Sequence, residues 1–300
     1  MLSGSLAAIV TPMFPDGALD EAAFDALVDF HAGQGTDGLV VAGTTGESPT
    51  LTPDEKLGLF RRAVERARGR LPVVAGTGSN STAASVELTR GACRTGVDAV
   101  LVVTPYYNKP TQEGLYRHFS AVADASAVPV ILYNVPGRTG CDLLPATVAR
   151  LAAHPRIAGI KEATAGIDRP REIRALCGGE FLILSGDDPT ACDMLLDGGH
   201  GVISVTANVA PALMHAMCAA ALDGDAAAAR AADERLRELH VALFVESNPI
   251  PLKWVLAHMG LIRAGLRLPL TPLDPRHMRR LESALAAAGV PAAAAPRAVS

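Results

Sequence analysis

A single lysine, Lys161, lies in the middle of the apolar segment Ile157–Thr164, IAGIKEAT. Apolar runs of this length with β-branched members are typical of buried strands, where a lysine is rare unless it is paired or used. Burial disfavours the ammonium form, and a neutral amine is a nucleophile for a carbonyl carbon. The segment therefore predicts Schiff-base chemistry. The alternative is a structural lysine that reaches solvent or pairs with Glu162.

Hydroxyl, guanidinium and backbone N–H groups follow other apolar runs, in GTTGES (Gly43–Ser48), TPYYNKP and YNVPGRTG. A Schiff base needs a proton shuttle and donors for the substrate carboxylate. Tyr133 is a weak acid that threonine hydroxyls can connect to other groups. Glycine-flanked Thr44 and Thr45 offer N–H groups for a small carboxylate, and Arg138 offers a bidentate contact for a second one.

Each of these segments also has a structural interpretation. GTTGES could be a turn and helix cap, and it lacks the lysine of a P-loop, which disfavours ATP or GTP binding. Tyr106 and Tyr107 could pack internally or contact another subunit. Arg138 could be a surface residue of a Pro-Gly turn. The histidines show no metal-ligand spacing, so we expect no metal site.

Eight β-like runs recur along the chain, each separated from the next by a helix-length segment. They are Leu6–Thr11, Gly38–Thr44, Pro72–Gly76, Ala99–Thr104, Pro129–Asn134, Ile157–Glu162, Phe181–Gly186 and Gly201–Thr206. Most are apolar on both faces, as expected for parallel strands covered on both sides. Amphipathic helical patterns alternate with them, so the sequence predicts an α/β fold, a (β/α)8 TIM barrel.

A doubly wound open sheet is the alternative fold, but such a sheet usually has a glycine-rich phosphate loop after its first strand. Here Thr-Pro-Met-Phe-Pro follows that strand. We assign residues 1–207 to the barrel and 208–290 to a closing helix and a helical extension, and we expect a disordered tail over 291–300. In a barrel the C-terminal ends of the strands meet at one mouth, so we expect the reactive segments above to lie together there.

Bulk composition excludes several classes of protein. The chain has 300 residues, 49% hydrophobic and 19% charged, with a net charge of −4. The sequence has no basic stripe that would indicate nucleic-acid binding. It also has no segment typical of a membrane span or a signal peptide. Five cysteines without a pairing pattern favour reduced thiols in a cytoplasm.

Together these segments resemble the dihydrodipicolinate synthase family (4-hydroxy-tetrahydrodipicolinate synthases), within the pyruvate-dependent class I aldolase superfamily. The motifs are GTTGES, TPYYNKP, YNVPGRTG, GIKEAT, LSGDD, GVISVTANVA and FVESNPIPLKW. GTTGE is shared across the superfamily, whereas YNVPGRTG is more specific, because Arg138 matches the family's position for the carboxylate of aspartate semialdehyde. The resemblance runs from about residue 3 to residue 290.

The resemblance implies a role for each catalytic side chain. Lys161 forms the imine with pyruvate, and the derived enamine attacks the aldehyde of L-aspartate 4-semialdehyde. Tyr133, Thr44 and Tyr107 form the proton relay, with Tyr107 reaching in from a neighbouring subunit.

It also implies the binding groups and the setting. Thr45 and the backbone at Ile203 bind pyruvate, and Arg138 binds the second substrate. No metal or organic cofactor is expected. The family is usually a homotetramer, a dimer of dimers, whose product feeds diaminopimelate and lysine biosynthesis. Two alternatives stay open: another pyruvate-dependent aldolase or lyase, for instance on a sugar acid, and a non-catalytic barrel.

The chain departs from the lysine-inhibited members of the family at two positions. Ser48, Asn80 and Tyr106 match their lysine-binding pattern. A glutamate of that pattern is Ala84 here, and a histidine is Lys56. The resemblance therefore implies weak or absent feedback inhibition by lysine.

Overall fold

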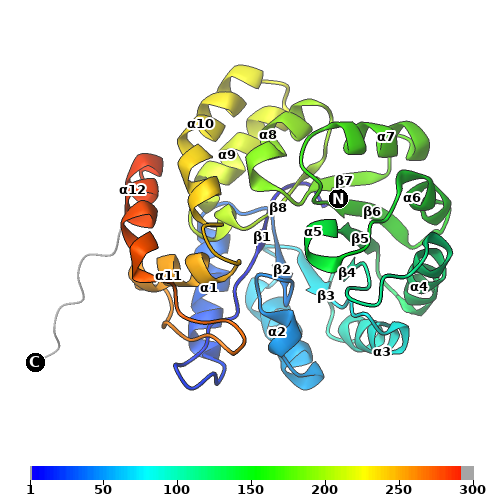
Figure 1. Ribbon diagram of the computed structural model, residues 1–300, viewed down its shortest axis with the longest axis horizontal. Helices are drawn as coiled ribbons and strands as arrows, with labels where there is room; N and C mark the ends of the chain where they lie inside the picture. The colour runs from blue at the N-terminus through cyan, green and yellow to red at the C-terminus, as the bar shows by residue number, and fades with distance from the viewer. Residues whose placement is uncertain (1, 292–300) are drawn as a thin grey trace, which may run out of the picture.

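Eight parallel strands close into a barrel in the order of the sequence, as the computed structural model of residues 2–291 shows (Figure 1). The strands are β1 (Gly4–Ala8), β2 (Gly38–Val41), β3 (Val73–Gly76), β4 (Ala99–Val103), β5 (Val130–Asn134), β6 (Ile157–Glu162), β7 (Leu182–Ser185) and β8 (Gly201–Ser204). Pairing of β8 with β1, with Ile203 opposite Leu6, closes the ring. The predicted (β/α)8 barrel is confirmed.

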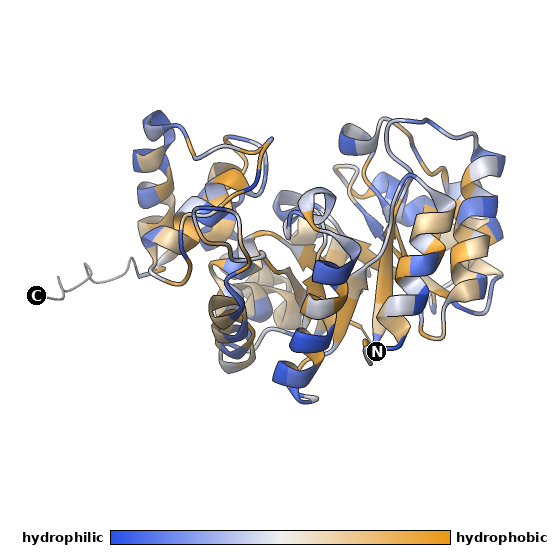
Figure 2. Cartoon of the chain, turned by 90° about the horizontal axis from the view of Figure 1, so that it is seen from below, coloured by the Kyte–Doolittle hydropathy of each residue, from blue (hydrophilic) through white to orange (hydrophobic). Residues whose placement is uncertain are grey.

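The strands are buried on both faces because the two sets of alternating side chains enter different cores. One set, including Leu6, Val74 and Ile131, fills the barrel interior. The other, including Val41 and Leu132, packs under the surrounding helices. Figure 2 shows the resulting apolar strands in the centre of the molecule. This explains why the strand sequences are apolar at nearly every position rather than alternating.

Eight helices lie between the strands. They are α1 (Glu21–Gly33), α2 (Pro53–Ala67), α3 (Thr82–Cys93), α4 (Gln112–Ala125), α5 (Pro136–Thr139), α6 (Pro145–Ala152), α7 (Asp168–Cys177) and α8 (Asp188–Leu196). Their starts follow local capping rules. Thr52 and Glu55 form a reciprocal capping box before α2, with Pro53 in the first turn.

Three strand predictions are partly wrong. The first strand is Gly4–Ala8 rather than Leu6–Thr11, the second ends at Val41 rather than at Thr44, and the eighth ends at Ser204 rather than at Thr206. Ala42 has a φ of 52°, in the left-handed region, so the chain turns out of the sheet there. Nothing in the residue type announces this, because alanine rarely adopts that conformation.

Four helices follow the last strand within the part of the chain that the structure describes: α9 (Pro211–Leu222), α10 (Ala226–Ala242), α11 (Ile250–His258) and α12 (Met278–Ala288). Short 3₁₀ turns lie at Ser48–Thr50, Thr206–Asn208 and Pro275–His277. The expected helical extension is therefore present, while the domain boundary at 207/208 stays a prediction. The expectation for the tail after Pro291 lies outside the described residues. Within residues 2–291, no helix has both the length and the apolarity needed to span a bilayer.

Candidate active site

A cavity of about 360 Å³ opens at the carboxyl ends of the strands. Thr44, Tyr133 and Arg138 line it together with Lys56 and Tyr106. Thr44 follows β2, Tyr106 follows β4, and Tyr133 lies near the end of β5, so three different strands bring these groups to one mouth. The position agrees with the rule that the active sites of such barrels lie at this end.

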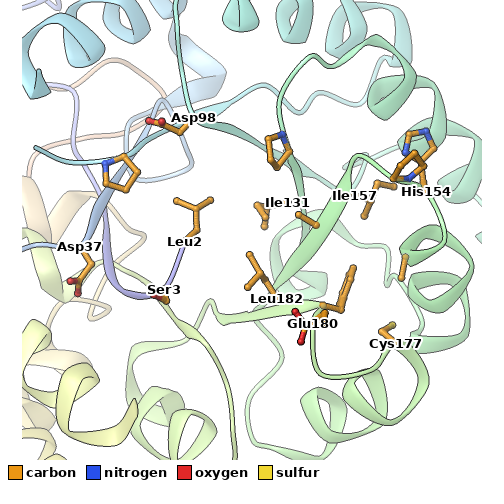
Figure 3. Close-up of a pocket in the computed structure, with 16 residues that line it drawn as sticks. Leu2, Ser3, Asp37, Asp98, Ile131, His154, Ile157, Cys177, Glu180 and Leu182 are labelled. Carbon is orange, nitrogen blue, oxygen red and sulfur yellow. The ribbon is translucent and has the colours of Figure 1, made fainter. Parts of the chain in front are cut away.

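A larger cavity, of about 900 Å³, lies at the opposite end of the barrel (Figure 3). Leu2, Ile131 and Leu182 surround its floor. Two acidic side chains on its wall serve the strand starts, because Asp37 accepts from the Ser5 N–H and Asp98 from the Val73 N–H, at 2.8 and 2.7 Å. These contacts stabilise the barrel end, and residues at that end of a barrel generally serve stability.

Lys161 lies in β6 with its side chain inside the barrel. It is 7% exposed, and its Nζ lies 4.4 Å from the centroid of the Tyr133 ring, on the neighbouring strand. Strand register places Tyr133 directly opposite it. Among residues 2–291 no carboxylate forms an ion pair with Lys161. The structural alternative, a pair with Glu162, is wrong because Glu162 bonds elsewhere.

Glu162 points to the other side of β6. Its carboxylate accepts hydrogen bonds from Asn134 Nδ2 at 3.1 Å and from the Thr164 N–H at 2.9 Å. Burial raises the pKa of Glu162, and these hydrogen bonds oppose the rise. Asn134 also accepts from the Leu143 N–H at 3.0 Å. The strand that carries the lysine is therefore fastened to the chain segment after α5.

Arg138 lies on the short helix α5, which the sequence analysis did not predict. The Arg138 and Thr139 N–H groups both donate to the Val135 carbonyl, at 2.9 and 3.1 Å, and start this turn of helix. The Arg138 side chain is exposed at the cavity, and no acid among the described residues pairs with it. An unpaired guanidinium at a cavity wall is suited to a carboxylate ligand.

The loop after β2 offers two free backbone donors. Gly43 carbonyl accepts from the Gly46 and Ser48 N–H groups at 3.1 and 3.2 Å, which curls the loop. The N–H groups of Thr44 and Thr45 donate to no group within residues 2–291. Ala42 and Glu47 both have left-handed φ values, 52° and 56°, each costing roughly 1–3 kcal/mol. Strain of this kind clusters where a loop must present a ligand site.

Tyr107 does not join the cavity of its own chain. Its side chain is 88% exposed, and its φ is 75°. The Asn108 N–H donates to the Tyr106 carbonyl at 2.9 Å, which closes a strained three-residue turn around Tyr107. The Tyr107 N–H donates to the Thr139 carbonyl at 3.1 Å, which ties this turn to α5. The tyrosine therefore projects away from the molecule from a well-anchored backbone.

Comparison with known proteins gives the family. The sequence profile of the dihydrodipicolinate synthetase family matches residues 1–288. The 4-hydroxy-tetrahydrodipicolinate synthase of Methylococcus capsulatus is 59% identical over 290 residues, 97% of this chain and 100% of that protein. This chain belongs to the dihydrodipicolinate synthetase family.

Solved structures of dihydrodipicolinate synthases share the fold of the whole chain. The chloride-inhibited enzyme from Acinetobacter baumannii, complexed with pyruvate, is 48% identical, with a TM-score of 0.96 over 97% of this chain and 100% of that one. A monomeric dihydrodipicolinate synthase variant is 42% identical, with a TM-score of 0.94 over 97% and 98% of the two chains. The resemblance stated from the motifs is confirmed.

The structure brings together only some of the residues that the family motifs predict as site residues. Thr44, Tyr133 and Arg138 share the cavity, and Lys161 lies against Tyr133. Ile203 contributes to the barrel interior and is 2% exposed. The Thr45 side chain is buried at 3% exposure and turns towards the helical extension rather than into the cavity.

Sequence reasoning missed several residues that shape the site of this family member. A side chain at Gly186 would place its Cβ 2.9 Å from Lys161 Cε, so the glycine leaves room for the lysine. Asn248 and Lys253 contact the loop after β2 from the extension. Gly186 belongs to LSGDD, and the other two belong to FVESNPIPLKW. The motifs therefore included these residues, but their contacts with the site could not be predicted from the sequence. No group of three or more metal-ligating side chains occurs among residues 2–291.

Proposed function

We propose that the cavity condenses pyruvate with L-aspartate 4-semialdehyde to give 4-hydroxy-tetrahydrodipicolinate. The family of the chain supports this reaction. The observation that carries it here is Lys161, a buried amine that has no carboxylate partner among residues 2–291 and lies 4.4 Å from the ring of Tyr133, which lines the cavity. A lysine in this setting is suited to imine chemistry with a keto acid.

The reaction begins when the neutral amine of Lys161 attacks C2 of pyruvate. The carbinolamine loses water to give an imine, and loss of a C3 proton gives an enamine. The enamine carbon bonds to the aldehyde carbon of the second substrate, whose oxygen takes up a proton. The amine of that substrate then attacks C2, closes the six-membered ring and releases Lys161. One water is released overall.

Proton transfers in these steps need hydroxyl groups near Lys161. Tyr133 contacts the lysine through its ring, and Thr44 lines the same cavity. We assign both to the relay. The relay is short of a third hydroxyl in the single chain, because Tyr107 is directed outward. We therefore assign that place to Tyr107 of a second copy.

The two carboxylates of the substrates go to two sides of the mouth. The free N–H groups of Thr44 and Thr45 suit the pyruvate carboxylate, with the backbone at Ile203 facing it across the barrel. The unpaired Arg138 suits the carboxylate of aspartate semialdehyde. This separation keeps the two acids from competing for one cation.

An assembly of several copies follows from the Tyr107 assignment. The left-handed backbone at Tyr107 costs conformational energy, and its side chain is 88% exposed in the single chain. A contact of this tyrosine with a second copy would give that strain a function. We propose a homotetramer built as a dimer of dimers. The monomeric variant among the structural relatives shows that the fold alone does not fix the number of copies.

We propose a cytoplasmic location and a role in lysine and diaminopimelate biosynthesis. The five cysteines are all unpaired, as expected for a reducing compartment. The proposed product is a precursor of these amino acids, and the proposed reaction that forms it uses no cofactor.

A coupled assay with pyruvate and aspartate semialdehyde tests the proposal, together with mass spectrometry of enzyme reduced by borohydride in the presence of pyruvate. We expect turnover and one reduced pyruvyl group at Lys161. Turnover with a sugar-derived aldehyde but not with aspartate semialdehyde would instead identify a different aldolase. Absence of any adduct would indicate a non-catalytic barrel.

A further inference from the structure

The loop Ala42–Ser48 needs support from outside itself. Two of its non-glycine residues, Ala42 and Glu47, have left-handed backbone conformations. Its Thr44 and Thr45 N–H groups make no internal hydrogen bonds that would fix their directions. A loop with these properties keeps one shape only when neighbouring groups determine it.

The helical extension supplies one such contact to Thr45. Asn248 Nδ2 donates to Thr45 Oγ1 at 3.0 Å, across 203 residues of sequence. Asn248 is 5% exposed and Thr45 is 3% exposed, so water does not compete for this hydrogen bond. The contact fixes the side chain of the residue whose backbone N–H we assign to pyruvate.

A second contact holds the other end of the loop. Glu47 forms an ion pair with Lys253 of α11, and both side chains are almost fully buried. Glu47 also accepts from the Arg267 N–H at 3.2 Å. The Arg267 guanidinium in turn donates to the Thr50 carbonyl at 2.7 Å. Neither buried charge can leave the other without a large desolvation cost, so α11 and the loop must move together.

The same contacts do not reach the other side of the mouth. Arg138 and α5 are held by Val135 and by the segment after α5, which Asn134 fastens to the strands. Among residues 2–291, no hydrogen bond or ion pair joins the extension to Arg138, so the extension acts on the pyruvate side.

We propose that Asn248 is a positioning residue for pyruvate, acting through the Thr45 hydroxyl, with the Lys253–Glu47 pair as the second anchor of the loop. The inference rests on the proposed function, because it assigns the pyruvate carboxylate to the Thr44 and Thr45 N–H groups. The helical extension is then part of the substrate-binding machinery and not only a cover for the barrel.

A double-mutant cycle between Asn248→Ala and Thr45→Val tests the proposal, with KM measured separately for the two substrates. In the native background we expect Asn248→Ala to raise the KM for pyruvate about tenfold and to leave that for aspartate semialdehyde within about twofold. In the Thr45→Val background, Asn248→Ala should change the KM for pyruvate less than about twofold. Thr45→Ser keeps the hydroxyl and should restore the full effect of Asn248→Ala.

A matched control removes an extension contact that does not touch the loop. Arg230 of α10 pairs with Asp193 of α8 at 2.8 Å, and Arg230→Ala should leave both KM values unchanged. If Asn248→Ala does not fold, the double variant Glu47→Gln/Lys253→Met, which removes both buried charges, is measured in its place. We expect its KM for pyruvate to rise while its KM for aspartate semialdehyde stays within about twofold.

Additive effects of Asn248→Ala and Thr45→Val, or equal changes for both substrates, would overturn the positioning role. A lower melting temperature with unchanged KM values would do the same. Pyruvate trapping at Lys161 in the unsubstituted protein separates this failure from failure of the proposed function. If that adduct is missing, the function itself is wrong.

Discussion

Two of the four lysines in this protein are buried, and their surroundings differ. Lys253 in α11 is 1% exposed and forms an ion pair with buried Glu47. Lys161 in β6 is 7% exposed, faces the ring of Tyr133, and has no acidic partner among residues 2–291. Burial alone therefore does not make a lysine reactive.

The partner decides the role of each lysine. Burial lowers the pKa of Lys253, while Glu47 opposes that change by stabilising the cation. An ammonium group in a tight ion pair has no lone pair to offer to a carbonyl carbon. Lys161 forms no such ion pair among residues 2–291, and Gly186 leaves space beside its side chain. The comparison predicts one reactive and one structural lysine.

The largest expected effect comes from Lys161→Ala. It should abolish trapping of pyruvate by borohydride and remove turnover, because the proposed reaction passes through an imine on this amine. Intact-mass and peptide mass spectrometry measure the adduct. An adduct on Lys56, Lys109 or Lys253 in the unsubstituted protein would break the comparison.

Lys253→Met should act on stability instead. Glu47 would keep a buried charge without its partner, at a cost of about 3–5 kcal/mol in the free energy of unfolding. Denaturant unfolding measures this, and the pyruvate adduct should still form at Lys161. Adding Glu47→Gln should recover much of the loss, because neither buried charge then remains. No recovery would mean that the packing of Lys253, rather than its charge, stabilises the loop.

Arg138→Ala extends the comparison to the second substrate. We expect pyruvate trapping to stay nearly intact and the condensation to slow about tenfold to a hundredfold, the loss of a charge-assisted hydrogen bond of about 1.5–3 kcal/mol. Steady-state kinetics with each substrate varied in turn make the measurement. Equal loss of imine formation would show that Arg138 serves pyruvate as well.

Tyr107→Phe should give a smaller loss, roughly tenfold in turnover, because it removes one hydroxyl of the relay and leaves Tyr133 and Thr44 in place. The effect should depend on assembly, so that a monomeric variant resembles Tyr107→Phe. Light scattering together with activity tests this. A fully active monomer would contradict the assignment of Tyr107 to a partner's site.

The smallest expected effect concerns inhibition by free lysine and the residue Lys56, a half-buried lysine that lines the cavity with Thr44, Tyr133 and Arg138. Burial lowers its pKa, and no acid pairs with it in the described chain. With Ala84 in place of a carboxylate, we expect millimolar lysine to inhibit weakly or not at all. Titration of lysine into the coupled assay decides this. Strong inhibition below millimolar lysine would show that Glu87 or another acid compensates.

The barrel was predictable because its signals are local. An apolar run followed by an amphipathic helical pattern repeats along the chain, and caps such as Thr52 mark where helices begin. The sequence therefore predicted the number and order of the strands. The position of Lys161 inside one apolar run predicted a buried lysine. The motifs predicted the family, and with it the reaction.

The details of the site depended on contacts between distant segments. Ala42 and Tyr107 adopt left-handed conformations that their residue types disfavour, so only tertiary contacts select them. Helix α5 was missed because a single turn after Val135 carries no periodic pattern.

The sequence by itself determined the barrel, the buried lysine in its sixth strand and three of the groups at its mouth, Thr44, Tyr133 and Arg138. Tertiary structure alone decided which buried lysine has a partner, because Glu47 lies 206 residues from Lys253 and no local pattern connects them. It also decided the direction of Tyr107, which a strained turn projects away from its own cavity. Charge pairing and backbone strain are properties of the folded chain, and periodicity in the sequence does not encode them.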